Sequence, residues 1–294
     1  MTAREALGVA EQRLKAARIR NYRVDARVLL AHVLGRPLSR LPLLMTQKLT
    51  EAQLRDFRAL LGRRQAREPL AYVTGDTEFM GLRFSCDPRV LVPRPDTETL
   101  VETVVELLQR VLACGIARPI VAEIGTGSGC VAVSVAHLVP SALVIATDIS
   151  PEALQVATRN AADNDVAQRI VFLQGDGPSA LLGHQDARRA DLLAWNPPYI
   201  PCDELDALEP EVSVHEPRVA LCGGEDGLDM YRQALGAAGR FPHLRAVAFE
   251  CGLGHSEPVS ELLRDHLPAW ELLVRRDLGG IQRVVAAWRP DSMV

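Results

Sequence analysis

Glu123-Ile124-Gly125-Thr126-Gly127-Ser128-Gly129 links an apolar run at residues 120–124 to a second apolar stretch at residues 130–138. Glycines permit positive φ angles and leave no Cβ between the backbone and a ligand. The first apolar run has the β-branched composition of a buried strand, and the second has the composition of a buried helix. The order of strand, glycine loop and helix predicts an α/β fold that binds a ligand on this loop.

The segments that follow repeat the alternation of strand and helix. Near-continuous apolar strands separated by helices are typical of a parallel sheet covered on both faces. Two closing runs at residues 271–276 and 282–288 lie close together in the chain and are expected to pair as antiparallel strands. The other strand-like runs span residues 143–146, 170–173, 192–195 and 246–249.

The chain before the glycine loop divides into two parts. Apolar residues recur at helical spacing through residues 1–75, which predicts a small helical domain, with Thr50 as an N-cap. Residues 76–95 are expected to form a β-hairpin linker, with strands at residues 78–84 and 89–92 and a turn at Cys86-Asp87-Pro88. Residues 96–294 would then be a Rossmann-like domain.

Composition excludes several classes of function. Of 294 residues, 48% are hydrophobic and 24% are charged, as in an ordinary globular protein, and the net charge of −4 argues against broad binding to nucleic acid. Arg63, Arg64 and Arg67 could still form a local basic face. Six dispersed cysteines with no metal-ligand spacing predict free, buried thiols and no metal site. No apolar run is long enough to span a bilayer, so we expect a cytoplasmic protein without membrane contact.

The spacing of the loop distinguishes between two cofactors. Dinucleotide loops follow the pattern Gly-x-Gly-x-x-Gly and bind a pyrophosphate, whereas this loop reads Gly-x-Gly-x-Gly, with an acid at Glu123. That acid would repel a pyrophosphate but suits the cationic part of S-adenosylmethionine. Asp148, at the end of the second strand, can accept hydrogen bonds from a ribose. The predicted cofactor-binding residues are Glu123, Gly125, Thr126, Gly127, Ser128, Gly129, Asp148, Asp176, Gly177 and Asn196.

A proline-rich tetrapeptide, Asn196-Pro197-Pro198-Tyr199, follows the fourth strand. The two prolines fix φ and remove two backbone donors. The Asn196 side-chain oxygen and the Pro197 carbonyl can therefore accept the two hydrogens of an NH2 group and direct its lone pair toward a methyl donor. Tyr199 would offer a ring face to the planar substrate group. The tetrapeptide predicts methylation of a planar nitrogen, in adenine, cytosine or a glutamine amide.

At this point the chain resembles the protein-glutamine methyltransferases, above all the peptide chain release factor glutamine methyltransferase (PrmC/HemK) family. The resemblance covers nearly the whole chain. Its most specific stretch is Pro93-Arg94-Pro95-Asp96-Thr97-Glu98, where a sister group acting on a ribosomal protein typically has Pro-Arg-Ser-Pro. The other matching stretches are residues 68–75, Glu78-Phe79, the glycine loop, residues 196–200, Glu216-Pro217 and residues 223–228.

The resemblance implies a class I S-adenosylmethionine-dependent methyltransferase with a Rossmann-like, mostly parallel sheet. By the same resemblance, Asn196 and Pro197 would bind a glutamine amide, and the substrate would be the Gly-Gly-Gln loop of class 1 release factors. The N-terminal helices would dock that protein, with no direct nucleic-acid substrate. Two residues depart from the family pattern, Gly177 in place of a bulky residue and His255 in place of a glutamine.

Three other interpretations stay open from the sequence. The same chemistry could act on a glutamine of a ribosomal protein. A nucleic-acid adenine methyltransferase could use the same tetrapeptide, although it needs stacking aromatics for a flipped base and aromatic residues make up only 4% of the chain. A non-catalytic, cofactor-binding scaffold is the alternative of a different class, and only Gly177 and His255 favour it.

Overall fold

In the computed structural model, which describes residues 1–293, the chain divides into two units. The helical unit comprises Met1–Asp76 together with Glu209–His215. The sheet unit comprises Thr77–Leu208 and the residues from Glu216 onward. The short segment Glu209–His215 thus belongs to the helical unit, although it lies far along the chain from the other residues of that unit.

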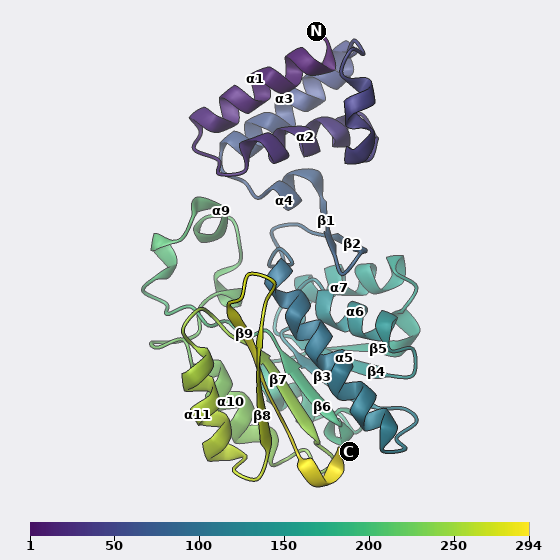
Figure 1. Cartoon of the computed structure of the whole chain (residues 1–294), viewed down its shortest axis with the longest axis vertical. Coiled ribbons are helices and arrows are strands. Elements are labelled where there is room, and N and C mark those ends of the chain that lie inside the picture. The colour runs from purple at the N-terminus through teal and green to yellow at the C-terminus, as the bar shows by residue number, and fades with distance from the viewer. Residues whose placement is uncertain (294) are drawn as a thin grey trace. The chain divides into compact units, whose positions relative to one another are not determined.

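The helical unit is built on two capping boxes. Thr2 accepts a hydrogen bond from the Glu5 amide while the Glu5 carboxylate accepts one from the Thr2 amide. Thr50 and Gln53 repeat this exchange, so the predicted N-cap is confirmed. Each box satisfies amides that the first turn of a helix leaves unpaired. The helices of this unit are α1 (Ala3–Ala16), α2 (Tyr22–Val33), α3 (Glu51–Gln65), α4 (Leu70–Thr74) and α9 (Pro210–Ser213) (Figure 1).

Arg63, Arg64 and Arg67, the candidates for a local basic face, form ion pairs with acidic side chains. Arg64 is buried, and it pairs with Asp25 at 2.7 Å and with Glu211 at 2.8 Å. Arg67 also pairs with Glu211, and Arg63 pairs with a neighbouring glutamate at 2.5 Å. These ion pairs argue against the local basic face that the sequence left open for these three side chains.

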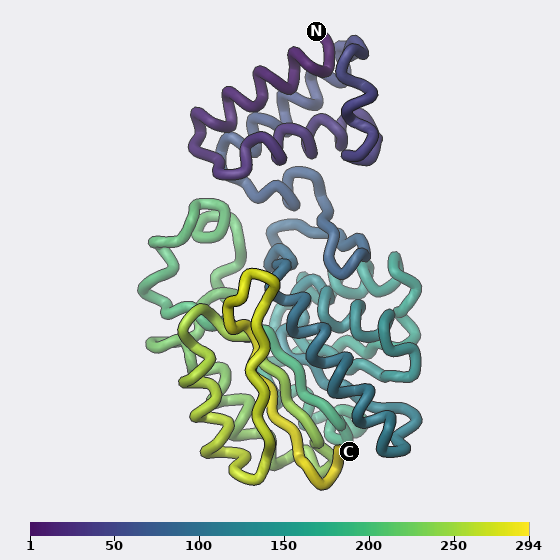
Figure 2. The backbone as a smooth tube through the Cα atoms, in the orientation of Figure 1, coloured from purple at the N-terminus to yellow at the C-terminus, as the bar shows by residue number. Residues whose placement is uncertain are grey.

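A seven-stranded sheet forms the centre of the sheet unit. Its strand order is β5-β4-β3-β6-β7-β9-β8. The pairs from β5 to β7 are parallel, and the last two pairs are antiparallel, which confirms the predicted closing hairpin, seen at the yellow end of the tube in Figure 2. The strands are β3 (Ile120–Ile124), β4 (Leu143–Asp148), β5 (Ile170–Gln174), β6 (Leu192–Trp195), β7 (Ala246–Glu250), β8 (Glu271–Arg276) and β9 (Gln282–Trp288).

Helices cover the sheet on both faces, because the side chains of each strand point alternately to the two sides. On β3, Val121 belongs to the core cluster that includes α5 and α6, whereas Ala122 and Ile124 belong to the cluster that includes α10 and α11 (Figure 1). The helices of the sheet unit are α5 (Glu98–Ala113), α6 (Cys130–Leu138), α7 (Pro151–Asp163), α8 (Gly177–Leu182), α10 (Asp229–Ala238) and α11 (Ser256–His266). Within residues 1–293, no helix is both long and apolar enough to cross a membrane.

The hairpin before this sheet differs from the prediction. Its strands are β1 (Asp76–Phe79) and β2 (Leu82–Ser85), so residues 89–92 are not a strand. Met80 and Gly81 form the turn, with φ angles of 50° and 72°. Two successive positive φ angles are what a type I′ hairpin turn requires. The predicted strand bounds and turn position were wrong because methionine is not a residue that normally indicates positive φ.

Asn160, on α7, connects this hairpin to the glycine loop. Its side chain is fully buried. The oxygen accepts a hydrogen bond from the Ser85 amide at 2.7 Å, and the nitrogen donates to the carbonyls of Ser85 at 3.1 Å and Ser128 at 2.8 Å. One side chain therefore satisfies three backbone groups in two segments.

Replacing Asn160 with alanine is expected to destabilise the sheet unit by about 3 kcal/mol, because it leaves these backbone groups unpaired in the interior. Urea unfolding followed by tryptophan fluorescence measures this unit, since Trp195, Trp270 and Trp288 all belong to it. Arg159→Ala, on the exposed side of the same helix, is the control and should have little effect. Equal unfolding curves for the two variants would contradict the role given to Asn160.

Candidate cofactor and substrate site

A cavity of about 210 Å³ lies at the carboxyl ends of β3, β4 and β6. The chain leaves β3 for β4 on one side and reaches β6 on the other, so the strand order reverses between β3 and β6. Ligands of open α/β sheets bind at such a reversal. The predicted site residues that line the cavity are Glu123, Gly125, Thr126, Gly127, Ser128, Asp148, Asp176, Gly177, Asn196 and Pro198. Gly129, Pro197 and Tyr199 are not among the lining residues.

The glycine loop depends on glycine for both conformation and space. Gly125 has a φ of 61°, and a Cβ there would lie 3.0 Å from Nε1 of Trp195. Gly129 has a φ of 80°, and its Cβ would lie 3.1 Å from Ala157. Gly129 therefore supports the loop by letting it approach α7, even though it does not line the cavity.

Asp148 holds the loop from the end of β4. Its Oδ2 accepts a hydrogen bond from the Gly127 amide at 2.7 Å, and its Oδ1 accepts one from the Ser150 amide at 2.9 Å. A carboxylate has about four lone-pair sites, so each oxygen can still accept a hydrogen bond from a ligand. Because Asp148 also lines the cavity, the same side chain can hold the glycine loop and contact a bound ligand.

Glu123 is the second acid of this region, and it is buried. Its Oε2 accepts a hydrogen bond from the Thr126 hydroxyl at 2.8 Å. Burial raises the pKa of Glu123 to about 8, and the negative charge of Asp148 also acts to raise it. A cation placed beside Glu123 would favour the carboxylate and lower this pKa. The carboxyl group therefore fits the cationic end of S-adenosylmethionine better than it fits a phosphate.

Gly177 explains one departure from the family pattern. It has a φ of 53°, and a Cβ there would lie 2.8 Å from the side chain of Gln233. A side chain at this position would have to displace the end of the Gln233 side chain on α10. Gly177 and its neighbour Asp176 both line the cavity, and Met230 of α10 lines it as well.

The tetrapeptide after β6 packs against a glycine-rich segment. A Cβ on Gly223 would lie 2.6 Å from the Pro198 carbonyl oxygen and 2.8 Å from the Cα of Tyr199. The Gly223 amide donates to the Ile200 carbonyl at 2.8 Å, and the Ile200 amide donates to the Leu221 carbonyl at 3.1 Å. Gly223 therefore packs directly against the loop that carries the prolines.

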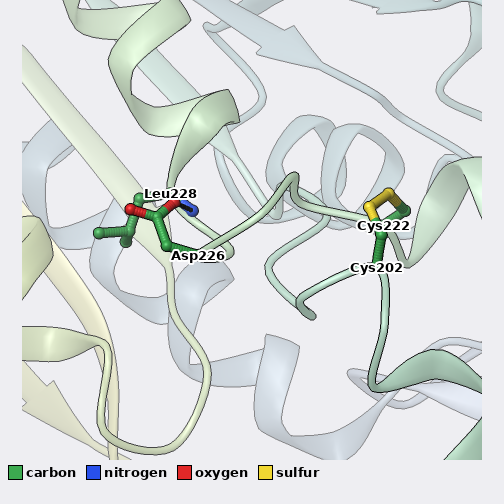
Figure 3. The surroundings of a disulfide bond; sticks show 4 residues. All are labelled: Cys202, Cys222, Asp226 and Leu228. Carbon is green, nitrogen blue, oxygen red and sulfur yellow. Dashed lines mark hydrogen bonds between the residues drawn. A yellow bond between two sulfur atoms is a disulfide. The ribbon is translucent and has the colours of Figure 1, made fainter.

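A disulfide joins the same two segments. Cys202 and Cys222 are bonded, and beyond them the Leu228 amide donates to Asp226 at 3.0 Å, closing a turn (Figure 3). The prediction that all six cysteines are free thiols is therefore wrong for this pair. The two lie 20 residues apart in the chain, a separation that predicts no pairing. Cys86, Cys130 and Cys251 are free thiols.

Tyr199 does not offer its ring to the cavity. The ring packs against His255, with a centroid separation of 6.4 Å, and burial raises the pKa of its hydroxyl to about 12. Neither residue lines the cavity. The expected contact of the ring with a planar substrate group therefore stays a prediction, and in the structure the ring packs against His255. His255, which replaces a family glutamine, is part of the same packing.

The sequence analysis did not identify three residues that line the cavity, Arg94, Thr97 and Trp195. Thr97 and Trp195 line it, and Asn196 donates from Nδ2 to the Thr97 hydroxyl at 3.1 Å. Arg94 also lines the cavity, and its Nη2 donates hydrogen bonds to both carboxylate oxygens of Glu216, at 2.8 and 2.7 Å. Arg94, Thr97 and Glu216 all lie in stretches that carry the family resemblance. That resemblance was the sequence feature that could have identified them as site residues. No three histidine, cysteine or acidic side chains among the described residues are arranged to hold a metal ion.

Known protein families match two parts of the chain. Residues 5–75 match the PrmC N-terminal domain, and residues 101–196 match the family described as ribosomal protein L11 methyltransferase (PrmA). Over 293 residues the chain is 42% identical to the release factor glutamine methyltransferase of Moorella thermoacetica, covering 99% of this chain and 100% of the relative. It is 43% identical to the protein of the same name from Bordetella pertussis, covering 89% of this chain and 93% of that protein.

Solved structures support the fold. The hMettl16 catalytic domain, solved in complex with the MAT2A 3'UTR hairpin 1, aligns with a TM-score of 0.58 at 16% identity, covering 83% of both chains. A second crystal form of the METTL16 MTase domain aligns with a TM-score of 0.54 at 15% identity, covering 88% of this chain and 91% of the other. At this level of identity the likeness establishes the class I methyltransferase fold alone.

Proposed function

The chain belongs to the family of release factor glutamine methyltransferases, and from that premise we propose the reaction of its site. The enzyme transfers a methyl group from S-adenosylmethionine to the side-chain amide nitrogen of the glutamine in the Gly-Gly-Gln motif of class 1 release factors. The observation that carries the proposal is a single cavity lined by the glycine loop, Asp148 and the Asn196-containing tetrapeptide. A methyl donor and a planar nitrogen would meet there.

Residues on one side of the cavity would hold the cofactor. Asp148 would accept hydrogen bonds from the ribose hydroxyls, and the loop from Gly125 to Ser128 would leave room for the amino-acid part. Asp176 would accept from the adenine amine. When bound, S-adenosylmethionine supplies an electrophilic methyl group on a positively charged sulfur. Glu123, buried behind Thr126, would supply the negative charge that favours this cation.

Asn196 and Pro197 would hold the substrate. An amide nitrogen is a poor nucleophile, because its lone pair is spread into the carbonyl group. Acceptors at the Asn196 side-chain oxygen and the Pro197 carbonyl would draw the two NH hydrogens out of the amide plane and direct the lone pair along one line. Pro197 and Pro198 lack backbone NH groups, so the loop does not present a competing donor from these two residues.

The helical domain of residues 1–75 would dock the release factor, and the reaction would take place in the cytoplasm. The pairing of Arg63, Arg64 and Arg67 with acidic side chains supports a protein substrate over a nucleic acid. A ribosomal protein remains the competing substrate, and a nucleic-acid adenine is a weaker one.

Intact-mass analysis of candidate substrates tests the proposal. A class 1 release factor incubated with the enzyme and S-adenosylmethionine should gain the mass of one methylene group, located by fragmentation on the glutamine of its Gly-Gly-Gln motif. A release factor with that glutamine replaced by alanine is the matched control and should gain nothing. Methylation of a ribosomal protein, of RNA or of DNA, with the release factor unchanged, would refute the substrate assignment.

A further inference from the structure

The Asn196 amide can act as an acceptor only if its oxygen faces the substrate. Asparagine oxygen and nitrogen have the same shape, so their orientation is set by the hydrogen bonds around them. In this chain the Nδ2 side of Asn196 faces the hydroxyl of Thr97 at 3.1 Å. Thr97 is itself buried, with an exposed fraction of 2%. It lies at the end of a 3₁₀ turn, Pro95–Thr97, directly before α5.

The Thr97 hydroxyl has a second partner, the carboxyl group of Glu250 at the end of β7. Glu250 is 1% exposed, and its Oε2 has no hydrogen-bond partner among residues 1–293. The Tyr231 hydroxyl donates to the Glu250 backbone carbonyl at 2.7 Å, which fixes the end of the strand. The side chains of Asn196, Thr97 and Glu250, which come from three separate segments, therefore form one hydrogen-bonded row.

Counting protons along this row fixes its direction. An ionised carboxylate only accepts hydrogen bonds, so Thr97 must give its one proton to Glu250. The Thr97 oxygen then has only lone pairs left for Asn196, and only Nδ2 can face it. We propose that Thr97 and Glu250 are positioning residues that hold the Asn196 amide with its oxygen toward the substrate NH2 group. The inference rests on the proposed function for the identity of that substrate.

The charge of Glu250 gives the row a pH dependence. Burial raises the pKa of Glu250 to about 7, Asp96 also raises it, and Thr97, Arg283 and Arg94 lower it. The other titratable groups that interact with Glu250 are Tyr199, Tyr231, Cys130 and Cys251. Once protonated, Glu250 can donate to Thr97, which frees the Thr97 proton for the Asn196 oxygen. The orientation is therefore enforced above about pH 7 and is lost as the pH falls through that value.

Replacing Thr97 with valine keeps the shape and removes the hydroxyl. We expect kcat for release factor methylation to fall by about 10- to 100-fold, because a catalytic group held in the wrong orientation misplaces the reacting atoms. The affinity for S-adenosylmethionine, measured by calorimetry, should stay near the wild-type value. Thr97→Ser restores the hydroxyl and should restore most of kcat. Thr103→Val is the matched control, because Thr103 is a buried threonine on α5 whose hydroxyl donates to the Thr99 carbonyl at 2.7 Å.

Two readouts separate positioning from a merely structural role. The wild-type kcat should decline as the pH falls below about 7, and Glu250→Gln should remove that decline. The side-chain NH2 resonances of Asn196, followed by NMR without any protein substrate, should shift with the same midpoint in the wild type and not in Thr97→Val. This second readout stands even if the wild type fails to methylate a release factor, which would refute the proposed function instead.

An unchanged kcat in Thr97→Val would overturn the inference, as would an equal loss in Thr103→Val. Asn196 resonances that do not respond to pH in the wild type would overturn it independently of the substrate.

Discussion

Replacing Asn196 with alanine is expected to lower kcat by about 10²- to 10³-fold, the loss typical of removing one preorganised polar group from a reacting centre. The side chain supplies the oxygen proposed to orient the amide nitrogen, and no neighbour in the tetrapeptide can replace it, since Pro197 and Pro198 carry only backbone carbonyls. The loss should fall on the chemical step, because Asn196 would contact the group that receives the methyl.

Single-turnover transfer to a release factor, monitored by intact mass, measures this effect. Affinity for S-adenosylmethionine should change little, because Asp148 and the glycine loop are untouched. Asn164→Ala is the matched control, since Asn164 lies outside the cavity and its Nδ2 donates to the Arg83 carbonyl at 3.0 Å. A variant at Asn196 with nearly wild-type kcat would show that the tetrapeptide does not activate the nitrogen.

The features that were predictable from sequence are local in the chain. Strand, glycine loop and helix follow one another from Ile120 to Leu138, and short-range apolar patterning is sufficient to identify them. The same holds for the closing hairpin, which was placed correctly from two neighbouring runs. Asp148 and Asn196 were found because each lies at the carboxyl end of a strand, where a parallel sheet gathers its ligand-binding groups.

The features that sequence missed depend on contacts between distant segments. Thr97 and Asn196 are 99 residues apart and meet only once the sheet has formed. The disulfide between Cys202 and Cys222 likewise needs the glycine segment to lie against the proline loop. The prediction of the β1–β2 turn failed for a different reason, because Met80 takes a positive φ that its residue type does not favour.

Glu250 could have been recognised from its position. It is the last residue of the apolar strand β7, as Asp148 is the last residue of β4, and ligand-binding groups of parallel sheets gather at this edge. Composition cannot reveal that the pKa of Glu250 is raised. That pKa depends on the burial of the carboxyl group and on the charges of Asp96, Arg94 and Arg283, which come from two other segments of the chain.

Replacing Asp148 with alanine is expected to weaken binding of S-adenosylmethionine by about 100-fold, because charge-assisted hydrogen bonds contribute about 1.5–3 kcal/mol each. The change removes the acceptor proposed for the ribose and also releases the amides of Gly127 and Ser150. Calorimetry on the purified protein measures the effect without any methyl acceptor. Asp163→Ala is the control, since Asp163 lies at the end of α7, outside the cavity, and forms a 3.5 Å ion pair with Arg159.

A cofactor analogue without ribose hydroxyls separates the two roles of Asp148. If the carboxylate contacts the diol, the wild type should lose affinity for the analogue, and Asp148→Ala should lose little more, because the two changes remove the same interaction. If Asp148 only holds the loop through Gly127 and Ser150, the losses from the mutation and from the analogue should add. Full additivity would therefore remove Asp148 from the cofactor-binding residues and leave it as a support of the glycine loop.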